Sequence, residues 1–274
     1  MRTEHKTVNL MQAQNVATLA AREAGAMMRR NLRSDKKANE ITQHDIKLEL
    51  DVRCQELIER RLVETFPGMA LLGEEGVTGN PRSDWRWVVD PIDGTVNFAY
   101  GIPHACVSIA LQHLGENPNT TTYEDGYHTE VGVVYDPFCD EVWTARLGQA
   151  ARLNSRPIQV SRRPKLAEAI LSIGFAKSSK NLDAMLPYFT RLVHRVRKIR
   201  ITGSAALALT YVATGRFDAY IEQGIRIWDI AAGGFITEQA GGEFWRQATG
   251  GDYAYRMVAS NGLLRKKLAA PIQS

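Results

Sequence analysis

The chain has 274 residues, of which 44% are hydrophobic and 23% are charged. A chain of this length and apolar content can bury a large core, so global disorder is excluded and either one large domain or two lobes is expected. The formal net charge of +4 is modest for this length and gives little support to a nucleic-acid surface, although basic residues gather between Arg191 and Arg200.

The first part of the chain predicts two helices joined by a polar connector. Apolar residues recur at helical spacing over residues 7–32, which predicts one long amphipathic helix. The polar stretch 33–44 interrupts this pattern and predicts a mobile connector that could cover a site. A second helix is predicted over residues 51–65, and it ends before Pro67-Gly68.

Two strands are predicted next. The apolar run 69–72 is interpreted as a strand that delivers Glu74-Glu75 at its exit, and residues 85–89 are interpreted as another strand. Because proline cannot donate a ladder hydrogen bond, Pro91 predicts that regular pairing ends after Asp90.

The remaining pattern predicts one more group of strands and then a second lobe. Residues 106–111, 131–135 and 141–145 are expected as successive strands of one sheet. Between the first two, the polar segment 115–129 predicts a long hairpin loop at a surface or an oligomer interface. After Gly148 helices and strands alternate. The elements predicted there are a helix with an apolar face at 182–196, a helix at 205–213, a strand at 218–221 and a helix at 230–240.

The N-terminal residues and the spacing of the cysteines are those expected of a cytoplasmic protein. No run of about 18 apolar residues occurs, and residues 1–6 lack the features of a secretory signal, so a soluble cytoplasmic protein without membrane contact is expected. Cys54, Cys106 and Cys139 lie far apart, which fits neither a disulfide framework nor a close zinc cluster. Reduced, mostly buried thiols are therefore expected.

The segment from Asp90 to Thr95 is the first candidate site. The strand end places Asp90 at the edge of the sheet, and Asp93 returns a second carboxylate, so both acids can face one cavity. Gly94 permits close backbone approach, and Thr95 can open a helical turn whose free N–H groups favour a phosphate. An isolated Asp-x-x-Asp-Gly is more often a solvated turn, but the longer context reverses that preference.

Two further acidic segments support this interpretation. Glu74-Glu75 alone would be a solvated pair, yet it follows one predicted strand and precedes the next, so Glu74 and Asp90 could share a cation. Asp229, after Trp228, is a candidate helix cap, and a cap is compatible with a metal ligand. Carboxylates alone would repel an anionic substrate, whereas around divalent cations they bind phosphate and activate water. The sequence therefore predicts a metal-dependent phosphatase site.

These segments resemble the signatures of the inositol monophosphatase family of magnesium-dependent, lithium-sensitive phosphatases. Residues 87–98 look like the first family signature, and residues 228–233 look like the second. The resemblance runs from about the first helix to Asn261. Further segments that carry it are 73–75, 203–206 and 212–215.

The resemblance implies a ligand set for two Mg²⁺ ions and a weaker third one. Glu74, Asp90 and the Ile92 carbonyl would hold the first ion, and Asp90, Asp93 and Asp229 would hold the second. The third ion would lie near Glu74.

The resemblance also implies which residues act on the substrate. Thr95, polarised by Asp51, would orient the attacking water, while the amides of Gly94 and Thr95 would receive the phosphate. The implied catalytic set is Asp51, Glu74, Asp93 and Thr95. The implied substrate contacts are Asp93, Gly94, Thr95, Gly203, Ser204, Ala205, Glu222 and Asp229.

The implied fold is a mixed α+β chain, a five-layer αβαβα sandwich of the inositol monophosphatase and fructose-1,6-bisphosphatase type. An N-terminal lobe of residues 1–147 would carry most metal ligands. A C-terminal lobe of residues 148–274 would supply Asp229 and the substrate pocket. Dimerisation is the family habit, so a homodimer is expected.

Hydrolysis of a myo-inositol monophosphate to inositol and phosphate is the first functional hypothesis, and Glu222 favours it. Relatives use the same scaffold on histidinol phosphate, fructose 1,6-bisphosphate or 3′-phosphoadenosine 5′-phosphate. The identity of the alcohol part of the substrate therefore stays open. A non-enzymatic alternative is a protein that binds RNA or a transcription complex. The basic stretch 191–200 is its only motive, and a solvated helix face explains that stretch better, so nucleic acid is not the expected partner.

Two positions depart from the family pattern. Leu48 stands where members commonly have a threonine before the acid matched by Asp51, so the supporting hydrogen bonds there can differ. The mobile-loop lysine of the family has no counterpart, because Glu40-Ile41 occupy the aligned positions while Lys36-Lys37 lie earlier. The contribution of the 33–44 loop to the third ion is left open.

Overall fold

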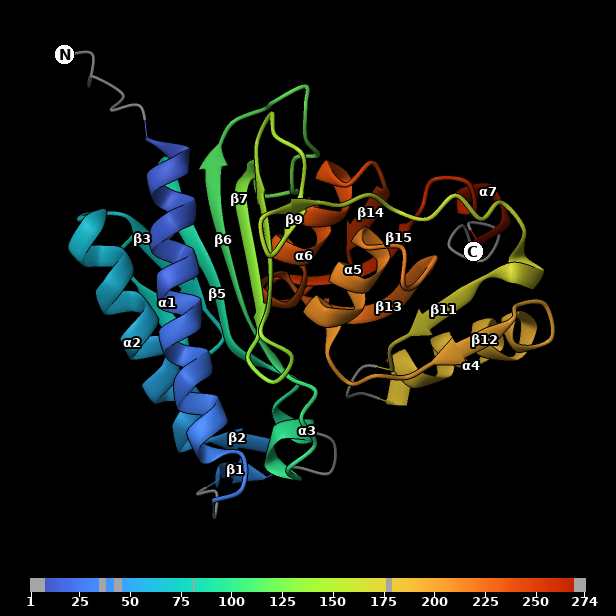
Figure 1. Cartoon of the computed structure of the whole chain (residues 1–274), viewed down its shortest axis with the longest axis horizontal. Helices are drawn as coiled ribbons and strands as arrows, with labels where there is room; N and C mark the ends of the chain where they lie inside the picture. Colours follow the sequence, from blue (N-terminus) through green and yellow to red (C-terminus); the bar gives the residue numbers. More distant parts are fainter. Residues whose placement is uncertain (1–7, 35–37, 42–45, 81, 176–178, 269–274) are drawn as a thin grey trace.

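Figure 1 shows the computed structural model, which describes residues 8–34, 38–41, 46–80, 82–175 and 179–268. Its α-helices are α1 (Leu10–Asn31), α2 (Glu49–Thr65), α3 (Thr95–Ala99), α4 (Ser179–Val193), α5 (Ala205–Ala213), α6 (Ile227–Gln239) and α7 (Arg265–Leu268). Helices α1 and α2 cover one face of a large sheet, and α5 and α6 lie between this sheet and a smaller one. Helices α4 and α7 pack on the far face of the smaller sheet. These layers confirm the predicted α+β fold and its five-layer αβαβα sandwich.

Strand pairing explains how the layers form. The large sheet consists of β3 (Ala70–Gly73), β4 (Gly76–Thr78), β5 (Trp85–Asp93), β6 (Cys106–Leu114), β7 (Tyr127–Asp136), β8 (Glu141–Arg146), β9 (Arg152–Leu153) and β10 (Arg156–Pro157). Its order is β10-β9-β8-β7-β6-β5-β3-β4, and only the pair β3 and β5 is parallel. The smaller sheet consists of β11 (Ile170–Ile173), β12 (Lys198–Arg200), β13 (Ala219–Arg226), β14 (Glu243–Ala248) and β15 (Ala254–Ser260). Its order is β12-β11-β13-β15-β14.

Small side chains let α1 pack closely on the large sheet. The side chain of Asn9 accepts hydrogen bonds from the N–H groups of Met11 and Gln12, at 3.1 Å each, and so caps the helix. Gly25 lies against the Tyr135 ring, where an added Cβ would come within 2.6 Å of a ring carbon. The buried face otherwise consists of Ala13, Ala17, Ala20, Ala21, Ala24 and Met28.

The central layer, formed by α5 and α6, is packed just as closely. A Cβ at Gly132 of β7 would lie 2.9 Å from the carbonyl oxygen of Ala232 in α6. Within the layer, a Cβ at Gly233 would lie 2.7 Å from the Cβ of Leu209 in α5. Apolar packing therefore fixes α5 and α6 against the sheet, and with them the residues at their N-termini.

We expect Gly132→Ala to lower the free energy of unfolding by about 1–3 kcal/mol, the usual cost of overpacking. The added methyl group meets backbone atoms of α6, which cannot rotate aside as a side chain could. The measurement is the urea midpoint at an unchanged m-value. A midpoint equal to or above that of the unmodified protein would show that α6 has more room over β7 than the structure gives it.

Regular pairing of β5 is interrupted after Asp90, as Pro91 predicts, but the strand does not end there. The strand continues to Asp93, because Asp90 pairs with Ser108, Asp93 pairs with Cys106, and the register shifts between the two pairs. Pro91 lies inside this bulge, where the ladder is already interrupted and an N–H is not required. The bulge keeps Asp90 and Asp93 together at one end of the sheet.

The connector predicted over residues 33–44 contains regular structure. Strand β1 (Ala38–Ile41) pairs in antiparallel register with β2 (Ile46–Leu48). The prediction of an irregular connector was therefore wrong over residues 38–41. Residues 35–37 and 42–45, which include Lys36-Lys37, lie outside the described residues.

The polar segment that follows β6 folds back onto the second half of the chain. The hydroxyl of Thr121 donates to Glu238 at 2.7 Å, and Arg246 donates to the Thr121 carbonyl at 2.6 Å. The N–H of Ala248 donates to Glu124 at 2.8 Å. Residues 127–129, predicted as part of the loop, already belong to β7. The segment therefore links the two halves of the chain at the surface.

The predicted division into lobes stays a prediction: the large sheet extends to Pro157, past residue 147, and the smaller sheet lies within residues 170–260. Cys54 and Cys106 are buried, Cys139 is exposed, and all three are free thiols, as expected. Across the described part of the chain, every helix is too short or too polar to cross a bilayer.

Candidate metal and phosphate site

Three carboxylates converge where the large sheet meets the central helices. Asp90 and Asp93 lie on either side of the β5 bulge, and Asp229 lies in the first turn of α6. One oxygen of each carboxylate lies within 4.8 Å of the oxygens of the other two. Asp90 and Asp93 are buried, and Asp229 is half-buried. The fold thus brings together three acids that the sequence separates widely.

Asp93 is held by the N-terminus of α5. Its carboxylate accepts hydrogen bonds from the Ser204 hydroxyl at 2.5 Å, from the Ala206 N–H at 2.7 Å and from the Ala205 N–H at 3.2 Å. Burial raises the pKa of Asp93, while these bonds lower it. Because the donors fix both oxygens, they orient the carboxylate and favour its charged form.

Asp90 and Asp229 are oriented by their own backbones. The Asp90 carboxylate accepts from the Ile92 N–H at 3.0 Å, within the bulge. The Asp229 carboxylate accepts from the Arg226 N–H at 2.9 Å, as a residue of the first helical turn can do. The Ser108 hydroxyl donates to the Trp228 carbonyl at 3.1 Å and ties the start of α6 to β6. Asp229 therefore supports the helix terminus and also faces the other acids.

Burial and mutual repulsion make this cluster unfavourable without a cation. Burial, followed by the charges of Glu74 and Asp93, raises the pKa of both Asp90 and Asp229 well above the usual range. Buried carboxylates at this spacing are stable when a positive charge lies between them. Carboxylate oxygens are the ligands of hard divalent cations, so the donor set fits a metal site of this kind.

The metal-free protein is expected to become less stable as the pH rises. Above the ordinary aspartate pKa of 3.8 the unfolded chain ionises fully, while Asp90 and Asp229 resist ionisation in the folded state because their folded pKa values are raised. The unfolded state then releases more protons, so stability falls until the pH has passed the raised values. Urea unfolding in a chelator, from about pH 4 to about pH 8, measures this, and saturating Mg²⁺ should remove most of the decline. A flat profile in the chelator would contradict it.

Glu74 is placed beside these acids by the end of β3. Its N–H donates to the Val89 carbonyl of β5 at 3.2 Å. The side chain of Gln55 accepts from the Glu75 N–H at 3.0 Å and donates to the Gly76 carbonyl at 3.3 Å, so α2 clamps this turn. Among the charged neighbours of Asp90 and Asp229, Glu74 raises the pKa of both most strongly. Its charge therefore acts on the same cluster.

Gly94 and Thr95 form the start of α3. Gly94 has φ 94° and ψ 36°, and a Cβ there would lie 3.0 Å from the His104 carbonyl and 3.2 Å from the Gly203 carbonyl. Glycine is therefore required both by the left-handed backbone and by the space. The Thr95 hydroxyl donates to the Ile92 carbonyl at 2.9 Å, so its own lone pairs face away from that oxygen.

Asp51 is buried in the first turn of α2. Its carboxylate accepts from the Leu48 N–H at 2.7 Å. The departure noted at position 48 therefore leaves this hydrogen bond intact, because the backbone supplies the donor. The implied contact between Asp51 and Thr95 stays a prediction.

The residues implied as substrate contacts lie at the start of α5 and on β13. Gly203 has φ 76°, and Ser204 is the N-cap of α5. Glu222 on β13 accepts a hydrogen bond from the Tyr220 hydroxyl. A Cβ at Gly174 would lie 1.9 Å from a Glu222 oxygen, so only glycine at the end of β11 leaves room for this carboxylate. Their role toward a substrate stays a prediction.

Asn97 is a positioning residue that the sequence reasoning did not single out. Its amide nitrogen donates to the His104 carbonyl at 2.9 Å and to the Thr202 carbonyl at 2.8 Å. It therefore ties α3 to the loop that leads into α5. Asn97 lies within residues 87–98, which the sequence analysis matched as a motif, but spacing alone does not reveal its partners.

Comparisons with known proteins show which proteins this chain is similar to. A model of the inositol monophosphatase family matches residues 9–274. The chain is 39% identical over 236 residues to Nus factor SuhB of Pseudomonas aeruginosa, covering 83% of each chain. It is 34% identical over 268 residues to inositol monophosphatase 1 of Solanum lycopersicum, covering 94% of this chain and 93% of that one. The crystal structure of extragenic suppressor protein suhB from Bartonella henselae matches with a TM-score of 0.85 at 31% identity, over 96% of this chain and 99% of that one.

Proposed function

Because this chain belongs to the inositol monophosphatase family, we propose that it is a Mg²⁺-dependent phosphomonoester hydrolase whose substrate is a myo-inositol monophosphate. The observation that carries the proposal is the convergence of the Asp90, Asp93 and Asp229 oxygens within 4.8 Å of one another. The similarity to plant inositol monophosphatases supports the choice of substrate.

We assign the ions to the carboxylate and carbonyl oxygens of the site. Glu74, Asp90 and the Ile92 carbonyl would hold one Mg²⁺, and Asp90, Asp93 and Asp229 would hold a second, with a weaker third ion near Glu74. When bound, such ions lower the pKa of water and neutralise phosphate charge.

The residues of the chain then have distinct tasks. Asp93 is oriented because Ser204, Ala205 and Ala206 donate to it, and these bonds favour its charged form. The N–H groups of Gly94 and Thr95 lie at the open start of α3, where a phosphate oxygen can accept from them.

The alcohol part of the substrate is assigned to residues from the other elements. Ser204 and Ala205 begin α5, and Glu222 on β13 is a carboxylate that can accept hydrogen bonds from polyol hydroxyl groups. The hydroxyl of Thr95, supported by Asp51, would orient the attacking water.

The test is turnover by the purified chain on four phosphate esters in saturating Mg²⁺. The esters are myo-inositol 1-phosphate, histidinol phosphate, fructose 1,6-bisphosphate and 3′-phosphoadenosine 5′-phosphate. The proposal requires the highest kcat/KM on the inositol ester and a large loss in Asp93→Asn. Turnover that is equal in Asp93→Asn, or a clear preference for another ester, would refute the activity or the substrate respectively.

Two family properties complete the proposal. Inhibition of turnover by Li⁺ is expected, as is a homodimer in solution. A lithium titration of the turnover rate and the molar mass from light scattering measure them independently of the substrate.

A second candidate is a role in transcription, because several relatives carry the name Nus factor SuhB. The exposed basic residues that would serve it lie on and around the edge strand β12 of the smaller sheet: Arg191, Arg195, Arg197, Lys198 and Arg200. Salt-sensitive RNA binding that survives Asp93→Asn would support this candidate. No retention on RNA at low salt would remove RNA binding from it.

A further inference from the structure

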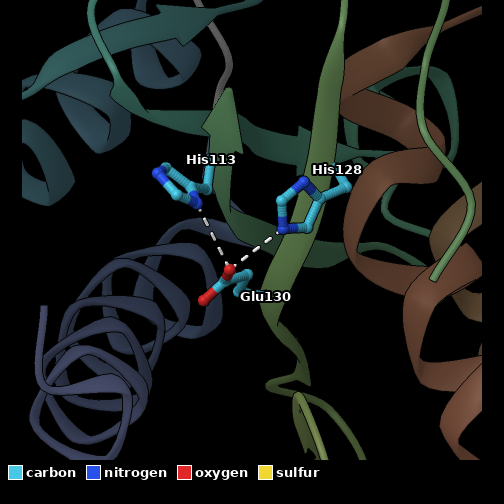
Figure 2. Close-up of side chains that lie close together, drawn as sticks. All are labelled: His113, His128 and Glu130. Carbon is cyan, nitrogen blue, oxygen red and sulfur yellow. Dashed lines mark hydrogen bonds and ion pairs between the residues drawn. The ribbon is translucent and has the colours of Figure 1, made fainter. Parts of the chain in front are cut away.

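A second group of metal-ligating side chains lies at the other end of the large sheet. One ligand atom each from His113, His128 and Glu130 lies within 4.8 Å of the others (Figure 2). Trp85 pairs with His113, and Asp93 pairs with Cys106, at opposite ends of the same two strands. Asp93 is eight residue steps along β5 from Trp85, which is roughly 26 Å of extended strand. This group is therefore separate from the carboxylate site.

The three side chains lie on one face of the paired strands β6 and β7. His113 and His128 are direct cross-strand partners on β6 and β7. The register shifts between Leu111 and Gln112, which pair with Val131 and Thr129, so Glu130 is the extra residue. Since side chains two residues apart on a strand lie on the same face, Glu130 lies on the face of His128, and the bulge leaves it without a partner residue on β6. Figure 2 shows Glu130 between the two imidazole rings.

The distances suit a tetrahedral ion. Nε2 of His128 lies 2.9 Å from Oε1 of Glu130, and Nδ1 of His113 lies 3.5 Å from the same oxygen. Ligand atoms about 2.0–2.2 Å from a tetrahedral Zn²⁺ are about 3.3 Å from one another, between these two values.

The two rings are held in place by neighbours. Nδ1 of His128 lies 2.6 Å from the Gly115 carbonyl, which can only accept, so this nitrogen carries the proton. Nε2 then faces Glu130 either with a second proton or with a lone pair for a metal. The His113 ring stacks on Trp85 with centroids 4.1 Å apart. Bonding of one ring nitrogen to a carbonyl while the other faces outward is the usual arrangement around a metal-bound histidine.

We propose that His113, His128 and Glu130 form a second metal site that takes a transition-metal ion such as Zn²⁺ rather than Mg²⁺. Two imidazole nitrogens and one carboxylate suit Zn²⁺, whereas Mg²⁺ prefers oxygen ligands only. The His113 side chain is 33% exposed, so water can reach the fourth position. A bound ion would cross-link β6, β7 and, through Gly115, the segment that folds onto α6 and β14. Its role is structural, because the carboxylate site is far away.

The test is a titration of the purified full chain, without an affinity tag, with Co²⁺ and then Zn²⁺ in saturating Mg²⁺. Mg²⁺ is present to fill the proposed carboxylate site, and a Cys139→Ser background removes the exposed thiol. We expect one equivalent of Co²⁺ with the visible absorption of a four-coordinate ion, displaced by Zn²⁺. His113→Asn and Glu130→Gln should weaken binding at least about tenfold, since loss of an outer partner alone costs about 10–100-fold.

Controls keep the proposal falsifiable. His194→Asn changes an exposed histidine elsewhere and should leave the affinity unchanged. Zn²⁺ should raise the melting temperature of the parent protein but not of His113→Asn, while turnover in Mg²⁺ stays the same in both. His113 is partly exposed, so its variant is the decisive one even where His128→Asn fails to fold. Equal affinity in His113→Asn, or no bound equivalent in the parent protein, would overturn the proposal.

Discussion

Asp229→Asn is expected to lower turnover at least about 100-fold, because metal-ion stabilisation of the reacting phosphate contributes several kcal/mol and each ~1.4 kcal/mol is a factor of ten. The same substitution should stabilise the metal-free protein, since it removes one of the like charges that raise the pKa of Asp90. An asparagine can still accept from the Arg226 N–H, so the helix terminus stays capped. Activity and stability therefore move in opposite directions.

Two measurements separate this expectation from a general folding defect. Initial rates at saturating Mg²⁺ give the loss of turnover, and urea unfolding in a chelator gives the gain in stability. Asp183→Asn is the matched control, because Asp183 is exposed on α4 and should change neither quantity. A variant that loses activity and also loses stability would indicate that Asp229 acts mainly as a structural residue.

Gly94→Ala is expected to lower the free energy of unfolding by about 2–5 kcal/mol. The left-handed backbone of Gly94 costs a residue with a Cβ about 1–2 kcal/mol, and crowding against the His104 and Gly203 carbonyls adds about 1–3 kcal/mol. Turnover should fall as well, because a backbone shift of about 1 Å at a reacting group can cost about 100-fold. Urea midpoints and initial rates measure the two effects.

Gly68→Ala is the matched control for this prediction. Gly68 has φ 86°, close to that of Gly94, but a Cβ there would meet no atom within 4 Å. Its substitution therefore carries the backbone cost alone and should leave turnover unchanged. If both variants lose the same stability and keep full activity, then space around Gly94 does not matter for the site.

The sequence indicated which carboxylates converge better than it predicted the strands around them. The carboxylates could be found because their chemistry requires acids next to strand and helix ends, and a family resemblance joined Asp229 to the others. The pairing of β5 beyond Asp90 could not be found, because Pro91 normally ends a ladder and only the bulge against β6 accommodates it. Strand β1 was missed because it has only four residues, and a mixed polar and apolar segment of that length carries almost no periodic signal.

Long-range partners were the information that the sequence lacked. Asn97 holds the loop before α5, and Ser204 orients Asp93, yet nothing in their spacing indicates which carbonyl or carboxylate they meet. The group around Glu130 was not found because His113 lies on another strand, and the sequence does not show which residue of β7 pairs with it. These contacts depend on strand register and on helix packing, which sequence patterns do not encode locally.

The most direct test of the central claim is a crystal structure of the protein with Mn²⁺ in place of Mg²⁺, in which anomalous scattering locates the ions. We expect at least two ions bound among the oxygens of Asp90, Asp93 and Asp229, one of them also in contact with Glu74. Anomalous peaks only elsewhere, with these carboxylates bonded solely to protein and water at saturating Mn²⁺, would contradict the account.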